Sequence, residues 1–189
     1  MSKVVGKMII VAAPSGAGKS SFVERVCSEE PRLFDTVTYT TRAMRVGESQ
    51  GKPYYFVTKS EFENRVQEGF FVEWARVHEN YYGTPLHQLE DSWAKGLCVI
   101  MDVDVQGVRT FRAKYPSAET IFIMPPSLDE LRRRLLKRDG EKIKDLDVRM
   151  RNAEIEMRSA PDFKHLLVND DFELSYQQFK KIVVEILDS

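Results

Sequence analysis

A chain of 189 residues is long enough for one α/β domain with a sizeable core, with or without small insertions. Its 28 basic and 29 acidic residues nearly cancel, which argues against a nucleic-acid partner bound through overall charge. No apolar run approaches membrane-spanning length and the first one is short, so we expect a soluble, cytoplasmic protein with no membrane partner.

Short apolar runs recur along most of the chain. They predict strands that are covered on both faces, at residues 8–12, 97–101, 120–124 and 166–168. Segments of helical periodicity lie between these runs. The alternation of strands and helices predicts an α/β fold with a parallel sheet core and helices on both faces.

Capping signals mark the starts of several helices. Thr84 is predicted to be the N-cap, and Pro85 the first residue, of a helix that runs to about residue 93. A capping box predicts a second helix at 128–137, and an apolar stripe predicts the last helix at about 176–187. Cys27, in a helix, and Cys98, in a strand, are expected to be buried free thiols. The three histidines lack ligand spacing, which argues against a zinc site.

The middle third of the chain has a different pattern. It contains short, aromatic-rich runs that predict half-buried antiparallel strands, at 36–39, 54–57 and 71–77. A capping box at Thr58 predicts a short helix between the second and third of these. We therefore expect a small mixed β lobe at about 34–86, inserted into a core of 1–33, 87–137 and 150–189. The charged segment 138–149, with Gly140 between two helices, is expected to be a mobile flap, or lid.

Residues 13–20 read Ala-Pro-Ser-Gly-Ala-Gly-Lys-Ser, between the first predicted strand and a helical pattern. This order predicts a phosphate-binding loop, in which backbone N–H groups and the helix N-terminus surround an anion. Lys19 would reach the outer phosphates, and the Ser20 hydroxyl would bind Mg²⁺. Ala13 departs from the general motif, which has glycine there. Taken alone, the loop leaves open a generic strand-to-helix turn with a solvated lysine.

Four further segments resemble the guanylate kinase family. They are TTRxxRxGE at 40–48, FxEW at 71–74, NYYGT at 80–84 and DVDVQGV at 102–108. With the phosphate loop, the resemblance runs to residue 171 and covers nearly the whole chain. It implies a single domain with the fold of a P-loop nucleoside monophosphate kinase. The implied activity is Mg²⁺-dependent transfer of the γ-phosphoryl group from ATP to GMP, giving ADP and GDP.

The resemblance also implies a GMP site, made of Thr38, Arg42, Arg45, Tyr54, Glu73, Tyr82, Thr84 and Asp104. Two arginines three residues apart can clamp a phosphate, although a solvated loop is the usual fate of surface arginines. The Glu73 carboxylate can accept from N1–H and the amine of guanine. Adenine has an unprotonated N1, so it would leave that carboxylate facing an acceptor and be rejected. Packing within half-buried strands is the alternative role of the two tyrosines.

The ATP site implied by the resemblance consists of Ala13, Pro14, Ser15, Gly16, Ala17, Gly18, Lys19, Ser20, Ser21, Arg134, Arg138 and Asn169. The implied catalytic residues are Lys19, Arg42, Asp102, Arg138 and Arg149. Positive groups around the transferred phosphoryl group suit a reaction that depends on positioning and electrostatics. A solvated basic helix face is the alternative for the arginines, with Arg132 and Arg133 expected at the surface. An ordinary strand-end aspartate is the alternative for Asp102.

Two other functions compete with this one. Some guanylate-kinase-like domains are protein-interaction modules, but those typically lack the glycines, lysine and serine that the phosphate loop retains here. A different nucleoside monophosphate acceptor is disfavoured by the pair Glu73 and Asp104. The expected partners are therefore ATP and GMP, with Mg²⁺ as cofactor, in a protein that is a monomer or a homo-oligomer.

Overall fold

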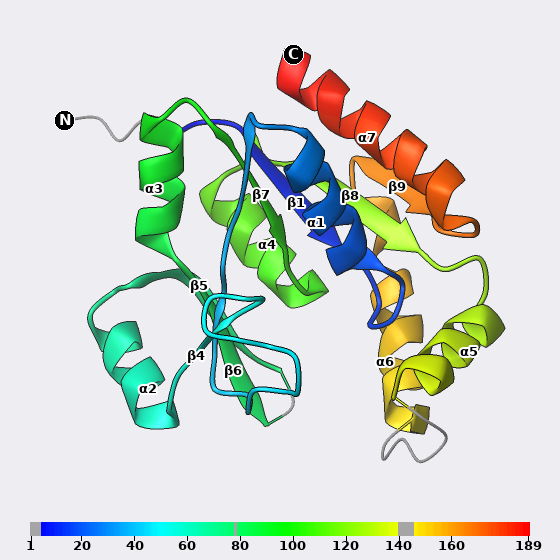
Figure 1. Cartoon of the computed structure of the whole chain (residues 1–189), viewed down its shortest axis with the longest axis horizontal. Helices are drawn as coiled ribbons and strands as arrows, with labels where there is room; N and C mark the ends of the chain where they lie inside the picture. Colours follow the sequence, from blue (N-terminus) through cyan, green and yellow to red (C-terminus); the bar gives the residue numbers. More distant parts are fainter. Residues whose placement is uncertain (1–4, 78, 140–145) are drawn as a thin grey trace.

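The computed structural model describes residues 5–77, 79–139 and 146–189. A five-stranded sheet in the order β2-β7-β1-β8-β9 forms the centre of the molecule, and every neighbouring pair in it is parallel (Figure 1). Its strands are β1 (Met8–Ala12), β2 (Leu33–Asp35), β7 (Cys98–Asp102), β8 (Glu119–Met124) and β9 (His165–Val168). The parallel sheet core is the one that the sequence predicts.

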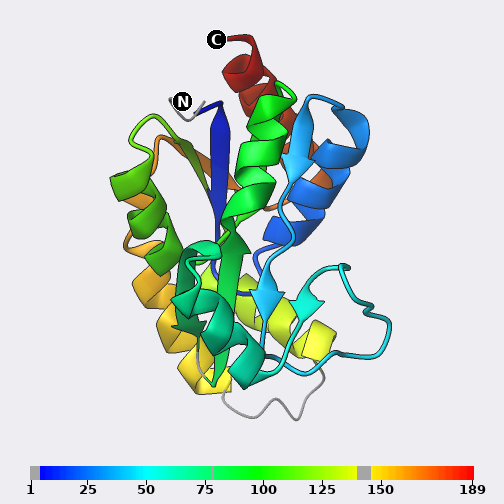
Figure 2. The same ribbon diagram turned by 90° about the vertical axis from the view of Figure 1, so that its left-hand side faces the viewer.

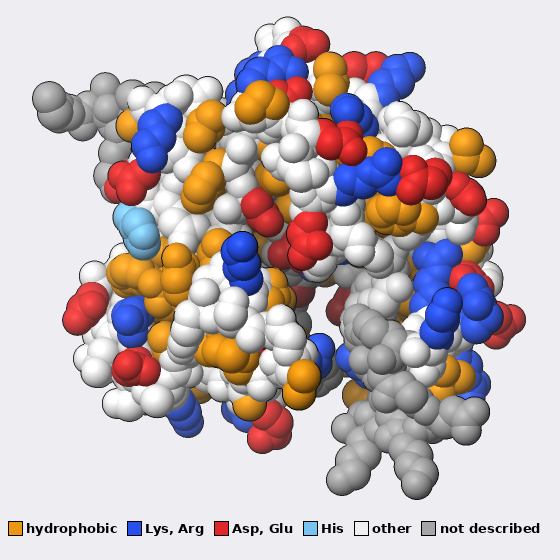
Figure 3. Space-filling model, in the orientation of Figure 1, with side chains coloured by type: hydrophobic (Ala, Val, Ile, Leu, Met, Phe, Trp, Pro, Cys, Tyr) orange, Lys and Arg blue, Asp and Glu red, His pale blue; other side chains and the backbone are white. Residues whose placement is uncertain are grey.

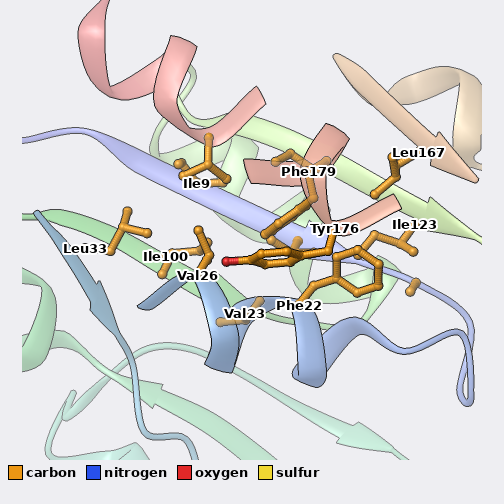
Figure 4. Packing of buried hydrophobic residues seen from close by; sticks show 14 of the residues in the cluster. Ile9, Phe22, Val23, Val26, Leu33, Ile100, Ile123, Leu167, Tyr176 and Phe179 are labelled. Carbon is orange, nitrogen blue, oxygen red and sulfur yellow. The ribbon is translucent and has the colours of Figure 1, made fainter. Parts of the chain in front are cut away.

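Helices cover both faces of this sheet because its central strands are apolar on both sides. On one face lie α1 (Lys19–Glu29) and α7 (Phe172–Asp188), and on the other lie α3 (Leu86–Ala94) and α4 (Val105–Lys114). Figure 4 shows the first layer, in which Phe22 of α1 packs beside Tyr176 and Phe179 of α7. Ile9 of β1 belongs to this layer, while its neighbour Ile10 belongs to the opposite one, as expected for successive strand residues.

A smaller sheet lies beyond one end of the larger sheet (Figure 2). Its order is β4-β3-β6-β5, and its strands are β3 (Tyr39–Thr40), β4 (Tyr55–Phe56), β5 (Phe71–Val77) and β6 (Asn80–Pro85). Helix α2 (Lys59–Gln67) begins at the predicted capping box and covers this sheet. Phe62 of α2 is fully buried and stacks on Phe71 and Tyr81, with ring centroids 4.6 and 5.5 Å away.

The remaining helices lie at the same end of the larger sheet, on the other side from α2 (Figures 1 and 2). They are α5 (Leu128–Asp139) and α6 (Leu146–Met157), and a short 3₁₀ turn, Ala160–Asp162, follows α6. Leu131 and Leu135 of α5 pack against Ala153 of α6. The segment expected to be a flap is thus helical at both ends, while Gly140 and its neighbours up to residue 145 lie outside the described residues. No described helix is long and apolar enough to cross a membrane.

Three local predictions were wrong. β3 and β4 pair in parallel, whereas the alternating runs suggested antiparallel strands, because two-residue strands carry no sequence signal for direction. Pro85 is the N-cap of α3 and not its first residue, since Thr84 still belongs to β6. Helix α7 begins at Phe172, four residues before the predicted start. The Asp171 carboxylate caps it by accepting from the backbone N–H of Leu174 at 2.9 Å.

The expected start of the inserted lobe, at about residue 34, falls inside β2. This strand pairs with β7 of the larger sheet, so Phe34 and Asp35 belong to the core. The smaller sheet itself begins at Tyr39. At its other end β6 stops at Pro85, and α3 follows at once.

Candidate functional site

A cavity of about 680 Å³ opens at the carboxyl ends of β1 and β7, between the smaller sheet and α6. Figure 3 shows this region as a hollow between the part that holds α2 and the part that holds α5 and α6. Ligands gather at this edge of an open parallel sheet, where strand ends and helix starts meet. Most of the predicted site residues line the cavity: Ala13, Pro14, Ser15, Gly16, Gly18, Lys19, Ser20, Ser21, Thr38, Arg42, Arg45, Tyr54, Glu73, Tyr82, Thr84, Asp102, Asp104, Arg134 and Arg149.

The phosphate loop connects β1 to α1 and depends on two glycines. Gly16 and Gly18 have φ of 93° and 98°, a region that residues with a side chain rarely adopt. A Cβ on Gly16 would lie 2.8 Å from Leu135, and one on Gly18 would lie 2.7 Å from the amide of Asn169. Gly18 is the N-cap of α1, so the positive end of that helix faces the cavity.

Lys19 and Ser20 begin α1 opposite the end of β7. The Ser20 hydroxyl donates to Oδ2 of Asp102 at 2.8 Å. The Lys19 ammonium donates to the carbonyl of Val103 at 3.0 Å and lies 3.9 Å from the same Asp102 oxygen. A hydroxyl and a carboxylate oxygen are ligands that suit Mg²⁺. Among the described residues there is no cluster of three or more His, Cys, Asp or Glu that would hold a metal without further ligands.

The two predicted phosphate arginines lie on a loop of the smaller lobe that Glu48 organises. The Arg42 guanidinium donates to Oε1 of Glu48 at 2.8 Å, and the Arg45 backbone N–H donates to Oε2 at 2.7 Å. Arg42 also lies over the Tyr54 ring, 5.5 Å from its centroid, and only 14% of its side chain is exposed. Arg42 is therefore held in place and not solvated as surface arginines usually are. Tyr54 lies beside Tyr82, with ring centroids 5.8 Å apart.

Glu73 is a buried carboxylate on the cavity wall. It lies on β5 directly opposite Thr84 of β6, and its residue is 8% exposed. Within the described part of the chain, neither Oε2 of Glu73 nor the Thr84 hydroxyl has a hydrogen-bond partner. Burial, helped by the nearby charge of Asp104, raises the pKa of Glu73 to about 7. Buried polar atoms of this kind usually have a partner, and here they face a cavity.

Asp104 lies near Glu73 but not on the strand that holds Asp102. β7 ends at Asp102, and the chain then turns, so Asp104 becomes the N-cap of α4. Its Oδ1 accepts from the backbone N–H of Gly107 at 2.6 Å. Both aspartates still line the cavity, because the strand end and the helix start are adjacent.

The residues predicted on the ATP side differ in their placement. Arg134 of α5 lines the cavity, donating to Glu130 at 2.8 Å and to the Asp170 carbonyl at 3.2 Å. Arg149 of α6 lines it too. Arg132 and Arg133 are exposed, as expected. Arg138 belongs to α5, but its side chain lies outside the described residues.

Two predicted ATP-site residues, Ala17 and Asn169, support the loop from behind and do not line the cavity. The Asn169 amide donates to the carbonyl of Ala17 at 2.8 Å, and both residues are buried. This bond links β9 to the phosphate loop. The bond holds Asn169 against the phosphate loop, and its predicted place beside the adenine stays a prediction.

Sequence reasoning missed several residues that line the cavity, among them Glu48, Asn152 and Glu156. Glu156 is half-buried, and burial raises its pKa to about 7, with the charge of Asp104 adding to the shift and Lys19 opposing it. The sequence signal for Asn152 and Glu156 is their helical spacing from Arg149, and that signal does not say which helix face meets the cavity. Residues 149, 152, 153 and 156 follow one helix face, which is the face of α6 towards the cavity.

Comparison with known proteins agrees with this geometry. The sequence model of the family described as guanylate kinase matches residues 5–186. A guanylate kinase of Bdellovibrio bacteriovorus is 58% identical over 181 residues, which are 96% of this chain and 98% of the relative. One of Haemophilus ducreyi is 41% identical and covers 95% of this chain, which spans 88% of that relative. The crystal structure of guanylate kinase from Anaplasma phagocytophilum resembles this one with a TM-score of 0.78 and 32% identity, covering 97% of this chain and 87% of that one. The chain therefore belongs to the guanylate kinase family.

Proposed function

We propose that this protein transfers the γ-phosphoryl group of ATP to GMP and so forms ADP and GDP. One observation carries the proposal: a single cavity is lined at one side by a phosphate loop and at the other by the buried carboxylate of Glu73. The first is a donor site for a nucleoside triphosphate. The second is suited to the N1–H and amine of a guanine base, because its Oε2 has no partner among the described residues.

Guanine selectivity follows from what Glu73 leaves unsatisfied. A guanine would supply N–H donors to Glu73 and Asp104, while Thr84 could share a hydroxyl bond with the base. Adenine presents an acceptor at N1, so it would leave the buried carboxylate unpaired. Sites that hydrogen-bond a specific group in this way reject the mismatched substrate strongly. Arg42 and Arg45 would bind the GMP phosphate, with the hydroxyls of Tyr54 and Tyr82 nearby.

On the donor side, the phosphates would lie in the loop, with Lys19 at the outer ones and Arg134 and Arg149 across the cavity. Ser20 and Asp102 would hold Mg²⁺, whose charge would offset that of the β- and γ-phosphates. The residues of the chain would hold the transferred phosphoryl group and the acceptor phosphate close together and surround them with positive charge. Such positioning and electrostatic stabilisation is the main protein contribution to phosphoryl transfer.

The alternative is an interaction module of the same fold without catalysis. The Gly16 and Gly18 conformations and the contacts of Lys19 and Ser20 with β7 favour a working phosphate loop. We also propose a cytoplasmic location, as expected for a kinase whose substrates are ATP and GMP.

A direct test offers ATP with GMP, AMP, CMP or UMP to the purified protein and measures ADP release. We expect release with GMP alone. Lys19→Ala should lower that rate by about 10²–10³-fold or more, because the outer phosphates lose their positive partner. A matched control is Lys181→Ala, which changes an exposed lysine of α7. Equal activity on all four acceptors, no activity on any, or normal turnover of Lys19→Ala would contradict the proposal.

A further inference from the structure

Helix α6 carries a second charged residue into the cavity, two turns after Arg149. Glu156 lies on the same helix face as Arg149, and both line the cavity. The carboxyl of Glu156 is half-buried and interacts electrostatically with Lys19 of the phosphate loop and with Asp104 at the start of α4. Lys19 belongs to the proposed donor side of the cavity and Asp104 to the proposed guanine side, and Glu156 lines the same cavity.

The Glu156 carboxyl forms no hydrogen bond within the described part of the protein. No hydrogen bond or ion pair joins its side chain to another side chain in the segments that the structure describes. A partly desolvated carboxyl loses hydration, and this is the reason that its pKa is raised. A ligand that donates hydrogen bonds at this position would restore what the carboxyl has lost.

The chemistry of the acceptor leaves few candidate donors for this carboxyl. The N1–H and amine of guanine lie with Glu73 and Asp104 in the proposed complex, and the phosphate offers acceptors to Arg42 and Arg45. The hydroxyl groups of the ribose are the donors of GMP that remain. The ribose joins the base to the phosphate, so it must lie between Asp104 and the region where the two phosphates meet. Glu156 borders the same region.

We propose that Glu156 binds the ribose hydroxyls of the acceptor nucleotide and so sets the preference for a ribonucleotide over a deoxyribonucleotide. This role rests on the proposed transfer to GMP. With this role, helix α6 would bind the substrates at two points, through Arg149 at the phosphates and through Glu156 at the acceptor ribose. The alternative is a role confined to orienting Lys19, which carries the opposite charge.

The test compares kcat/KM for GMP, dGMP and 3′-deoxy-GMP at saturating ATP. The kcat/KM of the wild-type protein should be higher for GMP than for at least one deoxy analogue by roughly tenfold or more, as expected for a lost hydrogen bond to a charged group. Glu156→Ala should lower kcat/KM for GMP by a similar factor and leave that analogue nearly unaffected. Glu156→Gln keeps an acceptor oxygen and the size of the side chain, so it should lose less.

Glu154→Ala is the matched control, because Glu154 lies on the same helix, is exposed and pairs with Arg158 at 2.9 Å. It should keep the preference for GMP. If Glu156→Ala loses the same activity on all three acceptors, the proposal is overturned in favour of the role of orienting Lys19. Equal kcat/KM of the wild-type protein for the three acceptors would also overturn it. Transfer to none of them by the unchanged protein would instead overturn the proposed function, and with it this inference.

Discussion

At the scale of single residues, Glu73 destabilises the folded protein when no ligand is bound. Its side chain is buried on β5, its Oε2 has no partner among the described residues, and its pKa is raised to about 7. A buried carboxylate without donors costs free energy in the folded protein. The proposed function accounts for that cost, since a guanine base would supply the missing donors only when it is bound.

Replacing Glu73 by Gln should therefore separate recognition from folding. Glutamine has nearly the same size but presents one amide donor to the base, so kcat/KM for GMP should fall by about 10²-fold or more. Binding of ATP should change little, because the phosphate loop lies across the cavity. The measurement is steady-state kinetics with GMP varied, together with calorimetry of ATP binding. Unchanged kinetics with GMP would contradict the guanine-binding role of Glu73.

The raised pKa of Glu73 also predicts that the stability of the protein depends on pH. Between pH 4.5, the ordinary pKa of the Glu73 carboxyl, and about 7, the unfolded chain releases its proton while the folded chain keeps it. Glu73 therefore lowers the free energy of unfolding as the pH rises through this range. Relative to the wild-type protein, Glu73→Gln should gain about 3 kcal/mol in the free energy of unfolding between pH 4.5 and about pH 8. Urea unfolding at both pH values measures this gain, and Glu154→Gln, at an exposed site, should show none.

At the scale of elements, a capping box fixes the start of α2, the helix that covers the smaller sheet. The Thr58 hydroxyl accepts from the Glu61 backbone N–H at 3.2 Å, and Glu61 accepts in return from the Thr58 backbone N–H at 2.7 Å. Thr58→Ala should lower the free energy of unfolding by about 1 kcal/mol, because it removes one acceptor of this capping box. Lys59→Ala, which changes a 68% exposed side chain one residue later, should cost less than about 0.5 kcal/mol. Equal costs in the two variants would contradict the capping role.

How much the sequence predicts varies from element to element. The capping box of α2 and the buried strand β1 were predicted because their signals are local and strong. The start of α7 was missed although local signals mark it, because Asp171 is a capping residue and Phe172 continues the apolar stripe of Tyr176 and Phe179. The parallel pairing of β3 and β4 was missed because it depends on contacts between distant segments.

The same limit applies to the site. The phosphate loop and Glu73 belong to contiguous motifs, so the sequence predicts them directly. Glu156 belongs to no such motif, and α6 carries charged residues around much of its circumference, so its sequence does not single out Glu156. Only the packing of α6 beside the cavity selects Glu156 from among them.

At the scale of the whole molecule, cationic side chains line opposite sides of one cavity. Arg42 and Arg45 come from the smaller lobe, whereas Lys19, Arg134 and Arg149 come from the side of the larger sheet. Like charges across an open cavity repel one another, and two bound nucleotides would place several phosphate groups between them. We therefore expect the lobe and the rest of the protein to approach when both substrates are bound, which would also exclude water from the phosphates.

Small-angle X-ray scattering can measure this approach. A bisubstrate analogue that joins adenosine to guanosine through phosphates should lower the radius of gyration below the value of the unliganded protein, and GMP alone should lower it less. Arg42→Ala should reduce the change, because the lobe loses its main contact with the phosphates. A matched control is Arg65→Ala, since Arg65 lies on α2 of the same lobe and does not line the cavity. An unchanged radius of gyration with the analogue would show that the cavity is already closed enough for transfer, in which case water would have to be excluded by the substrates themselves.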